Sequence, residues 1–504
     1  MFAFLLLMAA FRPLSVPDEG RYGEVGRWMW ESGDWVTPRL NGLPFFHKPP
    51  FVYWLEGMSI GLLGNHEFAL RLIPAFHVLL MTLVMHAGMT RVFDEKIARR
   101  AVMMLATSLT FLVGGQYVNH DMVVATWITI AVVCFAFSFM AGDCPDPVWA
   151  RWGFVACAVG FLSKGLIGFV LPGMVIFFWL VWTRQLKKLV RIPWLSGLGL
   201  FLLLSAPWII LTEQKFPGFF DYMFVNQHFK RFTTSNYNNQ QPFWFYILAL
   251  IVLFFPWIFF AVGRLKSQVT KERDKFQGKK CAWFILCWTW LVAITIFFSI
   301  PTSKLVGYIL PTIPPLACLA ALGWDAMMSK VKLEKLIFTG ICVINLIIGL
   351  AITYWASDFT KQKRSKDVAE VLACAASPND YVYVLGGYPY DLPFYAQTTR
   401  PLIVIENWIN LRKNARDGWH RELFEGADFD LQAAKNLQSP VSLAVAAGVP
   451  GNWLVTNVIA TDESLKHWQL DFSGVGWRMY RSSGTLASKS PKPTEHKSLP
   501  GCRY

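Results

Sequence analysis

Apolar segments long enough to cross a membrane follow one another along most of this chain, and they constrain its fold more than any other feature. A helix needs about 20 apolar residues to span the hydrocarbon core of a bilayer. After a first apolar segment at residues 1–10, further segments recur near residues 68–89, 101–117, 122–141, 152–162, 166–182, 194–211, 243–262, 282–300, 305–323 and 336–355. They predict a polytopic α-helical membrane protein with about eleven transmembrane helices. The composition agrees, because 54% of the 504 residues are hydrophobic and only 16% are charged.

The connections between these segments carry much of the positive charge of the chain. The formal net charge is +14, but no basic run is interleaved with stacking aromatic residues, so no nucleic-acid partner is expected. Basic residues gather at 91–100, 184–191, 264–280 and 330–335, and the order of the segments puts all four connections on one side. By the positive-inside rule, that side is cytoplasmic. The sequence therefore predicts that the other polar loops face the opposite side, which for a bacterial inner-membrane protein is the periplasm.

The hydropathy of the chain drops from about residue 358, which predicts a change from membrane-embedded to soluble structure. We expect a transmembrane domain at residues 1–357 with a periplasmic loop at 15–66, and then a small periplasmic α/β domain at 358–481. Strands are expected at 381–385, 402–405, 441–446 and 453–455, with helical patterns such as 367–376 between them. The tail at 482–504 is rich in Ser, Lys and Pro and is expected to be disordered.

Residues 15–50 form the longest polar interruption in the apolar first third of the chain. Ser15 followed by Asp18 predicts a helix start with a side-chain cap. Asp18, Arg21 and Tyr22 are spaced by three and four residues, so their side chains share one face of this short helix. Taken alone, the same pattern is also typical of an amphipathic surface helix with solvated charges.

Other ionisable residues on the expected periplasmic side are Asp121, Lys164, His228, Arg231 and Lys304. A charge in the hydrocarbon core costs about 2.5–3.5 kcal/mol, so such residues tend to face an aqueous cavity or a partner. Each also has a structural alternative: the two lysines as interface anchors, Asp121 as the N-cap of the next span, and His228 as an ordinary loop histidine. Together with Arg21 and Lys48, they indicate instead a site for a lipid phosphate next to a general base.

Several short motifs occur along the chain in a fixed order. The first is PDEGRYGEVGRWMWESGDWVTPRLNGLPFFHKPP at residues 17–50. NHDM at 119–122, LSKG at 162–165, HFKRF at 228–232, PFWFY at 242–246, PW at 256–257 and SKLVGYILP at 303–311 follow. This ordered set resembles the aminoarabinose transferase and protein mannosyltransferase-related superfamily, whose members are integral-membrane glycosyltransferases with the GT-C fold. The resemblance extends to about residue 320 and more loosely beyond it.

The resemblance implies transfer of a sugar from a polyprenyl (undecaprenyl) phosphate carrier to a periplasmic acceptor such as lipid A, another envelope glycolipid or a protein. It implies that Asp18 is the catalytic carboxylate and Asp121 a second one. The carrier phosphate would be held by Arg21, Lys48, Arg231, Lys304 and Tyr308. Tyr22 would line the same site, and supporting roles would fall to Glu19, Glu24 and Lys164.

One position departs from the family pattern. Family members usually have Glu before the Lys-Pro pair, and this chain has His47 there. In the aminoarabinose transferases, that Glu and the histidine of a later loop hold a divalent metal. His47 and His228 could still bind zinc, for which imidazole is a common ligand. Alternatively, His47 hydrogen-bonds the acceptor or the phosphate directly.

Single displacement at the sugar predicts inversion of its configuration, although a retaining route through a nucleophilic carboxylate stays open. The alternative from another class is a polyprenyl-lipid transporter or flippase. Transporters tend to have internal repeats and charges near the middle of their spans, whereas here no repeat is evident and the charges cluster on one face. The soluble domain has no evident pairing of a nucleophile with a base, so we expect it to guide the acceptor or to serve as a binding module.

Overall fold

Helices form most of the protein in the computed structural model, which describes residues 2–230, 239–263, 278–359, 361–414, 418–458 and 465–482. Contacts divide the chain into two compact units. The membrane unit comprises Met1–Phe11, His47–Val52 and Arg71–Tyr354, and the sheet unit comprises Arg12–Phe46, Tyr53–Leu70 and Trp355–Tyr504. The expected domain boundaries stay a prediction. The expected disordered tail lies, from residue 483 on, outside the described residues.

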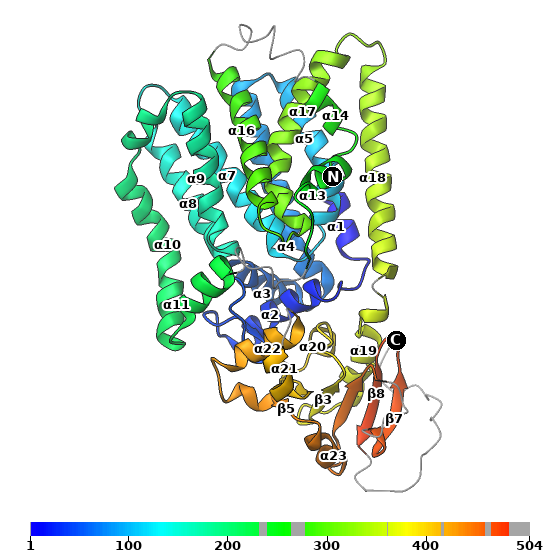
Figure 1. Ribbon diagram of the computed structural model, residues 1–504. Helices are drawn as coiled ribbons and strands as arrows, with labels where there is room; N and C mark the ends of the chain where they lie inside the picture. Colours follow the sequence, from blue (N-terminus) through cyan, green and yellow to red (C-terminus); the bar gives the residue numbers. More distant parts are fainter. Residues whose placement is uncertain are drawn as a thin grey trace. The chain divides into compact units, whose positions relative to one another are not determined.

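The long helices of the membrane unit run alongside one another (Figure 1). The helices are α1 (Phe2–Ala9), α4 (Glu67–Val92), α5 (Glu95–Ala106), α6 (Leu109–Gly114), α7 (His120–Met140), α8 (Pro147–Lys164), α9 (Ile167–Trp182), α10 (Trp194–Lys215), α11 (Phe219–Asp221), α13 (Phe245–Leu253), α14 (Ile258–Gly263), α16 (Lys279–Ser299), α17 (Ile313–Met328) and α18 (Glu334–Phe359). Within the described ranges, 6 helices are long and apolar enough to cross a membrane: Glu67–Val92, His120–Met140, Trp194–Lys215, Lys279–Ser299, Val306–Met328 and Glu334–Lys363. The predicted polytopic α-helical fold is confirmed, and the number of spans stays a prediction.

Three of the expected spans are interrupted in the structure. The segment 101–117 is divided between α5 and α6, where the Ser108 hydroxyl accepts a hydrogen bond from the backbone N–H of Phe111 and caps the second helix. The segment 243–262 is divided between α13 and α14 by a turn that contains Pro256, which has no N–H for a continuous helix. The segment 305–323 begins with the 3₁₀ helix η3 (Val306–Thr312), which contains Pro311, before α17 begins.

Helix α7 lies in the interior of the membrane unit, where it packs against α8, α9, α16 and η3. Nearly all of its side chains are buried. Helices α8 and α9 approach closely through two glycines, since a Cβ atom at Gly168 would lie 2.1 Å from the carbonyl carbon of Gly160. Two charged residues lie at helix ends in this part of the unit: Asp121 is in the first turn of α7, and Lys164 is the last residue of α8.

The sheet unit contains a 6-stranded sheet in the order β5–β4–β3–β6–β8–β7. Its strands are β3 (Val382–Leu385), β4 (Ile403–Ile405), β5 (Leu437–Gln438), β6 (Trp453–Thr456), β7 (Trp468–Ser473) and β8 (Arg478–Ser482). The four strands β5, β4, β3 and β6 are parallel, and β8 and β7 add an antiparallel edge. The helices of this part are α19 (Lys366–Ala375), α20 (Leu392–Ala396), α21 (Trp408–Asn414), α22 (Trp419–Ala427) and α23 (Val441–Ala447). The predicted small α/β region is confirmed.

The prediction of a strand at residues 441–446 is wrong, because these residues form helix α23. Its apolar side chains follow a helical pattern: Leu443, Ala446 and Ala447 are buried, whereas Val441 and Val445 are exposed. A short apolar run can form either a strand or a helix. Here the buried residues lie on one side of a helix, which explains the difference. The other three expected strands are present as β3, β4 and β6.

The polar loop near the N-terminus belongs to the sheet unit over most of its length. It forms helices α2 (Asp18–Ser32) and α3 (Phe51–Leu63) and a two-stranded hairpin, β1 (Arg39–Leu40) and β2 (Leu43–Pro44). Asn41, at the tip of the hairpin, exchanges two hydrogen bonds with the backbone of Leu402, at 2.9 and 2.7 Å. The side-chain cap expected from Ser15 is absent, because α2 begins after Pro17 without one. The loop and the C-terminal sheet are therefore packed together as one body.

Candidate functional site

A cluster of charged and aromatic side chains surrounds Arg21 in the first turns of α2. The Arg21 guanidinium contacts the carboxylate of Asp18, one turn earlier, and the carboxylate of Glu422 on α22. It also lies 4.8 Å from the ring centroid of Tyr22 and 5.6 Å from that of Tyr390. The Tyr390 hydroxyl donates a 2.6 Å hydrogen bond to Glu422. The predicted helical face of Asp18, Arg21 and Tyr22 is therefore present, and it meets residues about 370 to 400 positions further along the chain.

Arg21 is held in a position that strongly favours its charged form. Burial alone would lower the pKa of its guanidinium, but electrostatic interactions with Tyr22, Glu422 and Asp18 raise the pKa well above its ordinary value. The Arg21 side chain is 13% exposed, whereas that of Asp18 is 35% exposed. Asp18 is therefore the more accessible member of the ion pair, which suits a carboxylate that must meet a substrate.

Two of the other acidic residues of α2, Glu19 and Glu24, form structural ion pairs. Glu19 pairs with Arg12 at 2.5 Å and accepts a 2.7 Å hydrogen bond from the backbone N–H of Ser15. Glu24 forms two hydrogen bonds of 2.7 Å with Arg27, and burial raises the pKa of Glu24 in spite of this partner. These contacts explain how the helix is anchored, and the supporting role expected for both residues stays a prediction.

Helix α3 brings a buried carboxyl group, Glu56, against α2. Its side chain is fully buried, and within the described ranges neither carboxyl oxygen has a hydrogen-bond partner. Desolvation by burial therefore raises its pKa well above the ordinary value. A Cβ atom at Gly26 would lie 2.6 Å from the Glu56 Cβ, so the absence of a side chain at Gly26 makes this contact possible. Glu56 was missed in the sequence because an acidic residue in an apolar helix has no motif of its own.

A second charged cluster lies in the membrane unit, where α7 begins and α8 ends. Asp121 forms an ion pair with Lys164, and the Lys164 ammonium lies 4.5 Å from the ring centroid of Tyr308 in η3. Asn119 caps α7 by accepting a 2.9 Å hydrogen bond from the backbone N–H of Asp121. The N-cap alternative for Asp121 is therefore wrong. The anchor alternative for Lys164 is wrong as well, because its side chain is only 9% exposed and points to Asp121.

Gly307 allows η3 to approach Asp121 closely. A Cβ atom at Gly307 would lie 2.1 Å from Asp121 Oδ2, far inside van der Waals contact. Any other residue would therefore displace either η3 or the Asp121 carboxylate. Through this contact the SKLVGYILP motif takes part in the Asp121 cluster.

Lys304 lies in the segment that leads into η3, and its side chain is buried. Its ammonium donates hydrogen bonds to the carbonyl oxygens of Gln241, at 3.0 Å, and Pro301. Desolvation by burial lowers its pKa from the ordinary value. A lysine held by backbone carbonyls in this way is not an anchor that reaches outward, and its expected role at a phosphate stays a prediction.

The residues of the expected metal and phosphate site are only partly described. The His47 ring lies 6.3 Å from the ring of Tyr222, so the segment Tyr222–Lys230 folds against the HKPP motif. The side chain of His228 and all of Arg231 lie outside the described residues, and the role expected for Lys48 at the phosphate stays a prediction. Among the described residues, no group of three His, Cys, Asp or Glu side chains could hold a metal ion. Two histidines alone do not complete a tetrahedral zinc site.

Glu422 and Tyr390 are site residues that the sequence did not indicate. Glu422 lies in the stretch WHRELFEG, which has no recognisable signature, and the spacing of about 400 residues from Arg21 gives no local pattern. Both residues come from the α/β region, for which we expected no part in the chemistry. The contact of Glu422 with Arg21 places this region directly at the candidate site.

Known proteins resemble this chain in sequence and in fold. The family described as dolichyl-phosphate-mannose-protein mannosyltransferase matches residues 47–211. The undecaprenyl phosphate-alpha-4-amino-4-deoxy-L-arabinose arabinosyl transferase of Pectobacterium atrosepticum is 33% identical over 67% of this chain and 60% of its own length. The protein of the same name from Serratia proteamaculans is 32% identical over 72% of this chain and 66% of its own length. The matched part thus spans somewhat less than two thirds of these relatives.

Two solved structures share the fold. ArnT from Cupriavidus metallidurans, bound to undecaprenyl phosphate, matches 97% of both chains with a TM-score of 0.81 and 23% identity. The archaeal oligosaccharyltransferase AglB from Archaeoglobus fulgidus matches 96% of this chain and 74% of its own, with a TM-score of 0.51 and 14% identity. The chain is therefore a multi-pass membrane protein with the GT-C fold, and it belongs to the aminoarabinose transferase and protein mannosyltransferase-related superfamily.

Proposed function

We propose that this protein is a glycosyltransferase that moves a sugar from an undecaprenyl phosphate carrier to an acceptor such as lipid A, another envelope glycolipid or a protein. The observation that carries the proposal is the Asp18–Arg21–Glu422 cluster, which stands on the first motif of the superfamily. The names of the relatives make 4-amino-4-deoxy-L-arabinose the first sugar to test.

In the proposed reaction, the acceptor hydroxyl or phosphate attacks the anomeric carbon of the sugar. The new bond takes its electron pair from the acceptor oxygen, and Asp18 orients that oxygen and accepts its proton where one is present. The bond between the anomeric carbon and the carrier oxygen breaks, and the carrier phosphate leaves with the electron pair of this broken bond. A single displacement of this kind inverts the configuration at the sugar.

Cationic side chains stabilise the charge that develops on the leaving phosphate. In a site of low dielectric constant, a fixed positive charge stabilises this charge far more than it would in water. Arg21 is held for this role by Glu422 and Asp18. Lys48, Arg231, Lys304 and Tyr308 are assigned to the phosphate by the resemblance.

We also propose that the protein resides in a bacterial inner membrane with both clusters on the periplasmic side. The support is the positive-inside rule, applied to the basic connections of the sequence. Within the membrane unit, Arg91, Lys188, Arg191 and Lys279 occur where α4, α7 and α9 end and α16 begins, whereas Asp121 and Lys164 occur at the opposite ends of α7 and α8.

A transfer assay separates the proposed enzyme from a lipid transporter. The purified full chain is reconstituted in vesicles with undecaprenyl phosphate-aminoarabinose and lipid A, and the mass of lipid A is measured. An increase by one sugar residue that depends on both donor and protein supports the transferase. Movement of the donor lipid between leaflets without any sugar transfer would instead support the transporter.

We further propose a bound divalent metal, for which zinc is the first candidate. This part of the proposal rests on His47 and His228 alone. We expect metal analysis of the purified protein to find a metal that both His47→Ala and His228→Ala deplete. The double variant should then be little worse than either single variant, because both remove the same site. If the wild type holds no metal and keeps its activity in chelator, the metal is not part of the mechanism.

A further inference from the structure

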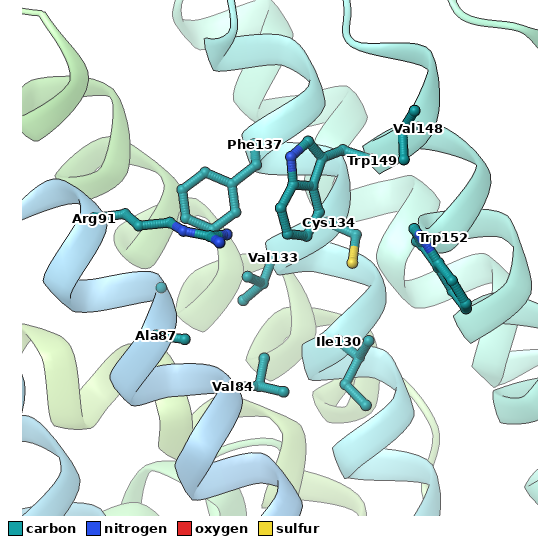
Figure 2. A pocket seen from close by; sticks show the side chains of 11 residues that line it. Val84, Ala87, Arg91, Ile130, Val133, Cys134, Phe137, Val148, Trp149 and Trp152 are labelled. Atoms are coloured by element: carbon teal, nitrogen blue, oxygen red, sulfur yellow. The ribbon is translucent and has the colours of Figure 1, made fainter.

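An apolar cavity opens in the membrane unit between the end of α4, the end of α7 and the start of α8. Its volume is about 500 Å³, which lies within the usual range for ligand sites. Figure 2 shows its wall, to which α4 contributes Val84 and Ala87, α7 contributes Ile130 and Val133, and α8 contributes Val148 and Trp152. Val148 and Trp152 are more than half exposed, so the cavity opens to the outer surface of these helices.

Arg91 lies at the edge of this cavity. Its guanidinium carbon lies 5.4 Å from the ring centroid of Phe137 and 5.0 Å from that of Trp149, and Figure 2 shows the side chain reaching from α4 toward both rings. Among the residues that the structure describes, Arg91 has no ion pair and no hydrogen bond. A guanidinium fixed by two aromatic rings, with its five N–H groups still available, is suited to bind a phosphate.

A second cavity of about 370 Å³ shares Arg91, Phe137 and Trp149 with the first and is more polar. Lys279 at the start of α16 and Asp146 at the start of α8 also line it. The Asp146 carboxylate accepts hydrogen bonds from the backbone N–H groups of Val148 and Trp149, at 2.8 and 3.0 Å, and so serves as a helix cap. Two cations thus line this cavity with a single carboxylate that is already engaged.

The surrounding helix ends add to the positive charge. Lys188 donates hydrogen bonds to the carbonyl oxygens of Phe139 and Gly142, at 3.2 and 2.6 Å, and Arg191 donates one to that of Asp143, at 3.4 Å. The basic segment η1 (Leu186–Arg191) therefore packs against the connection between α7 and α8. An apolar cavity opening sideways, beside a basic polar cavity at the helix ends, matches the chemistry of a lipid with an anionic headgroup.

We propose that these two cavities bind an anionic phospholipid of the bilayer. One acyl chain lies in the apolar cavity between α4, α7 and α8, and the headgroup phosphate lies against Arg91 and Lys279. The site is distinct from the Asp121–Lys164 cluster, because Phe137 follows Asp121 on α7 by 16 residues, or roughly 24 Å of helix. The lipid would hold α4, α7, α8 and α16 together at the ends opposite to that cluster.

Native mass spectrometry of the delipidated full chain tests this proposal, with phosphatidylglycerol and phosphatidylcholine as probes. We expect the wild type to retain phosphatidylglycerol in preference. Arg91→Gln should weaken its binding about fivefold, which is the effect of one cation near an anionic headgroup. Lys279→Gln should have a similar effect, and it serves as the test if Arg91→Gln does not fold. Arg99→Gln is the matched control, because this exposed basic residue at the start of α5 does not line either cavity.

A second variant tests the apolar part of the site without changing its charge. Ala87→Phe, at an exposed position on α4, should fill the cavity and lower the retention of phosphatidylglycerol. Equal retention of the two lipids by the wild type, or equal loss in Arg91→Gln and Arg99→Gln, would overturn the proposal. Displacement of phosphatidylglycerol by stoichiometric undecaprenyl phosphate would also overturn it, because the cavities would then belong to the sugar carrier.

Discussion

At the scale of single residues, each of the two candidate clusters consists of charges that are held in place by other charges. Arg21 lies between Asp18 and Glu422, and Lys164 lies against Asp121. Buried or half-buried ions need such partners, because an uncompensated charge away from water is strongly destabilising. The partners therefore determine where each cation can meet a substrate phosphate.

Glu422 should act as a positioning residue for Arg21. We expect Glu422→Gln to lower the transfer rate about tenfold, because a hydrogen bond to a charged group contributes about 1.5–3 kcal/mol. Glu425→Gln on the same helix, which weakens the pairing with Arg421 instead, should leave the rate nearly unchanged. The rate at saturating acceptor, measured over a range of donor concentrations, checks this. Equal rates in both variants would show that Glu422 does not position Arg21.

Gly307 should be intolerant of any side chain. Gly307→Ala places a Cβ atom 2.1 Å from Asp121 Oδ2, so the carboxylate must move away from Lys164. We expect a loss of activity of at least tenfold together with a lower melting temperature. Gly340→Ala on α18 is the control, because a Cβ atom there meets nothing within 4 Å. Wild-type activity in Gly307→Ala would mean that the geometry of the Asp121–Lys164 pair is not needed.

The residue scale also shows where sequence reasoning ends. Asp18, Arg21 and Tyr22 could be placed on one face because their spacing is local and the helical repeat is fixed. Asp121 and Lys164 could be assigned to one side of the membrane, but not to one ion pair. Glu422 could not be found at all, because its contact with Arg21 depends on the tertiary packing of α22. Ionisable residues outside a motif need the fold before they can be assigned a role.

At the scale of helices and strands, the junction of α2, α19 and α20 is the most informative part of the sheet unit. Asp391, at the start of α20, accepts a 2.7 Å hydrogen bond from the Ser365 hydroxyl and others from the Ser365 backbone N–H, just before α19. A Cβ atom at Gly20 of α2 would lie 3.0 Å from the backbone nitrogen of Asp391. The buried carboxyl of Asp391 thus lies where three helices meet.

The pH dependence of stability should report on Asp391. Burial raises its pKa from 3.8 to about 6, although the Ser365 hydrogen bonds oppose this effect. The folded protein therefore binds this proton more tightly than the unfolded chain. The resulting stabilisation is fully present below pH 3.8 and is lost as the pH rises through about 6. Such a change in pKa corresponds to at most about 3 kcal/mol.

Melting temperatures between pH 4 and 7 check this expectation. Asp391→Asn keeps an oxygen for the Ser365 hydrogen bonds but cannot titrate, so its melting temperature should vary less over this range than that of the wild type. The exposed Asp428, changed to Asn, serves as the control and should behave as the wild type does. Identical pH profiles for wild type and Asp391→Asn would contradict the assignment.

Element boundaries were less predictable than element types. The long apolar segments gave helices because 20 apolar residues have few other solutions in a membrane. The breaks at Ser108 and Pro256 depend on one capping hydroxyl and one proline inside apolar stretches. The run at 441–446 was mistaken for a strand because so short a segment, apolar except for Ser442, does not define a period without knowledge of which side is buried.

At the scale of the whole molecule, the structure consists of a helical membrane unit and a unit that joins the N-terminal polar loop to the C-terminal sheet. The membrane unit could be predicted from hydropathy and charge, and the α/β character of the C-terminal part from its strands. The packing of the N-terminal loop with the C-terminal sheet could not be predicted, because Asn41–Leu402 and Arg21–Glu422 are contacts across hundreds of residues. The sheet region thereby contributes to the same cluster as the first motif.

The most direct test of the central claim is sugar transfer by Asp18→Asn in the reconstituted vesicle assay. Asn keeps the shape of the side chain and removes its charge and its ability to accept a proton. We expect a fall of at least a hundredfold in transfer, which is within the usual contribution of general base catalysis, with donor binding retained. Glu31→Gln, at an exposed position on the same helix, should transfer at the wild-type rate. Wild-type transfer by Asp18→Asn would contradict the account.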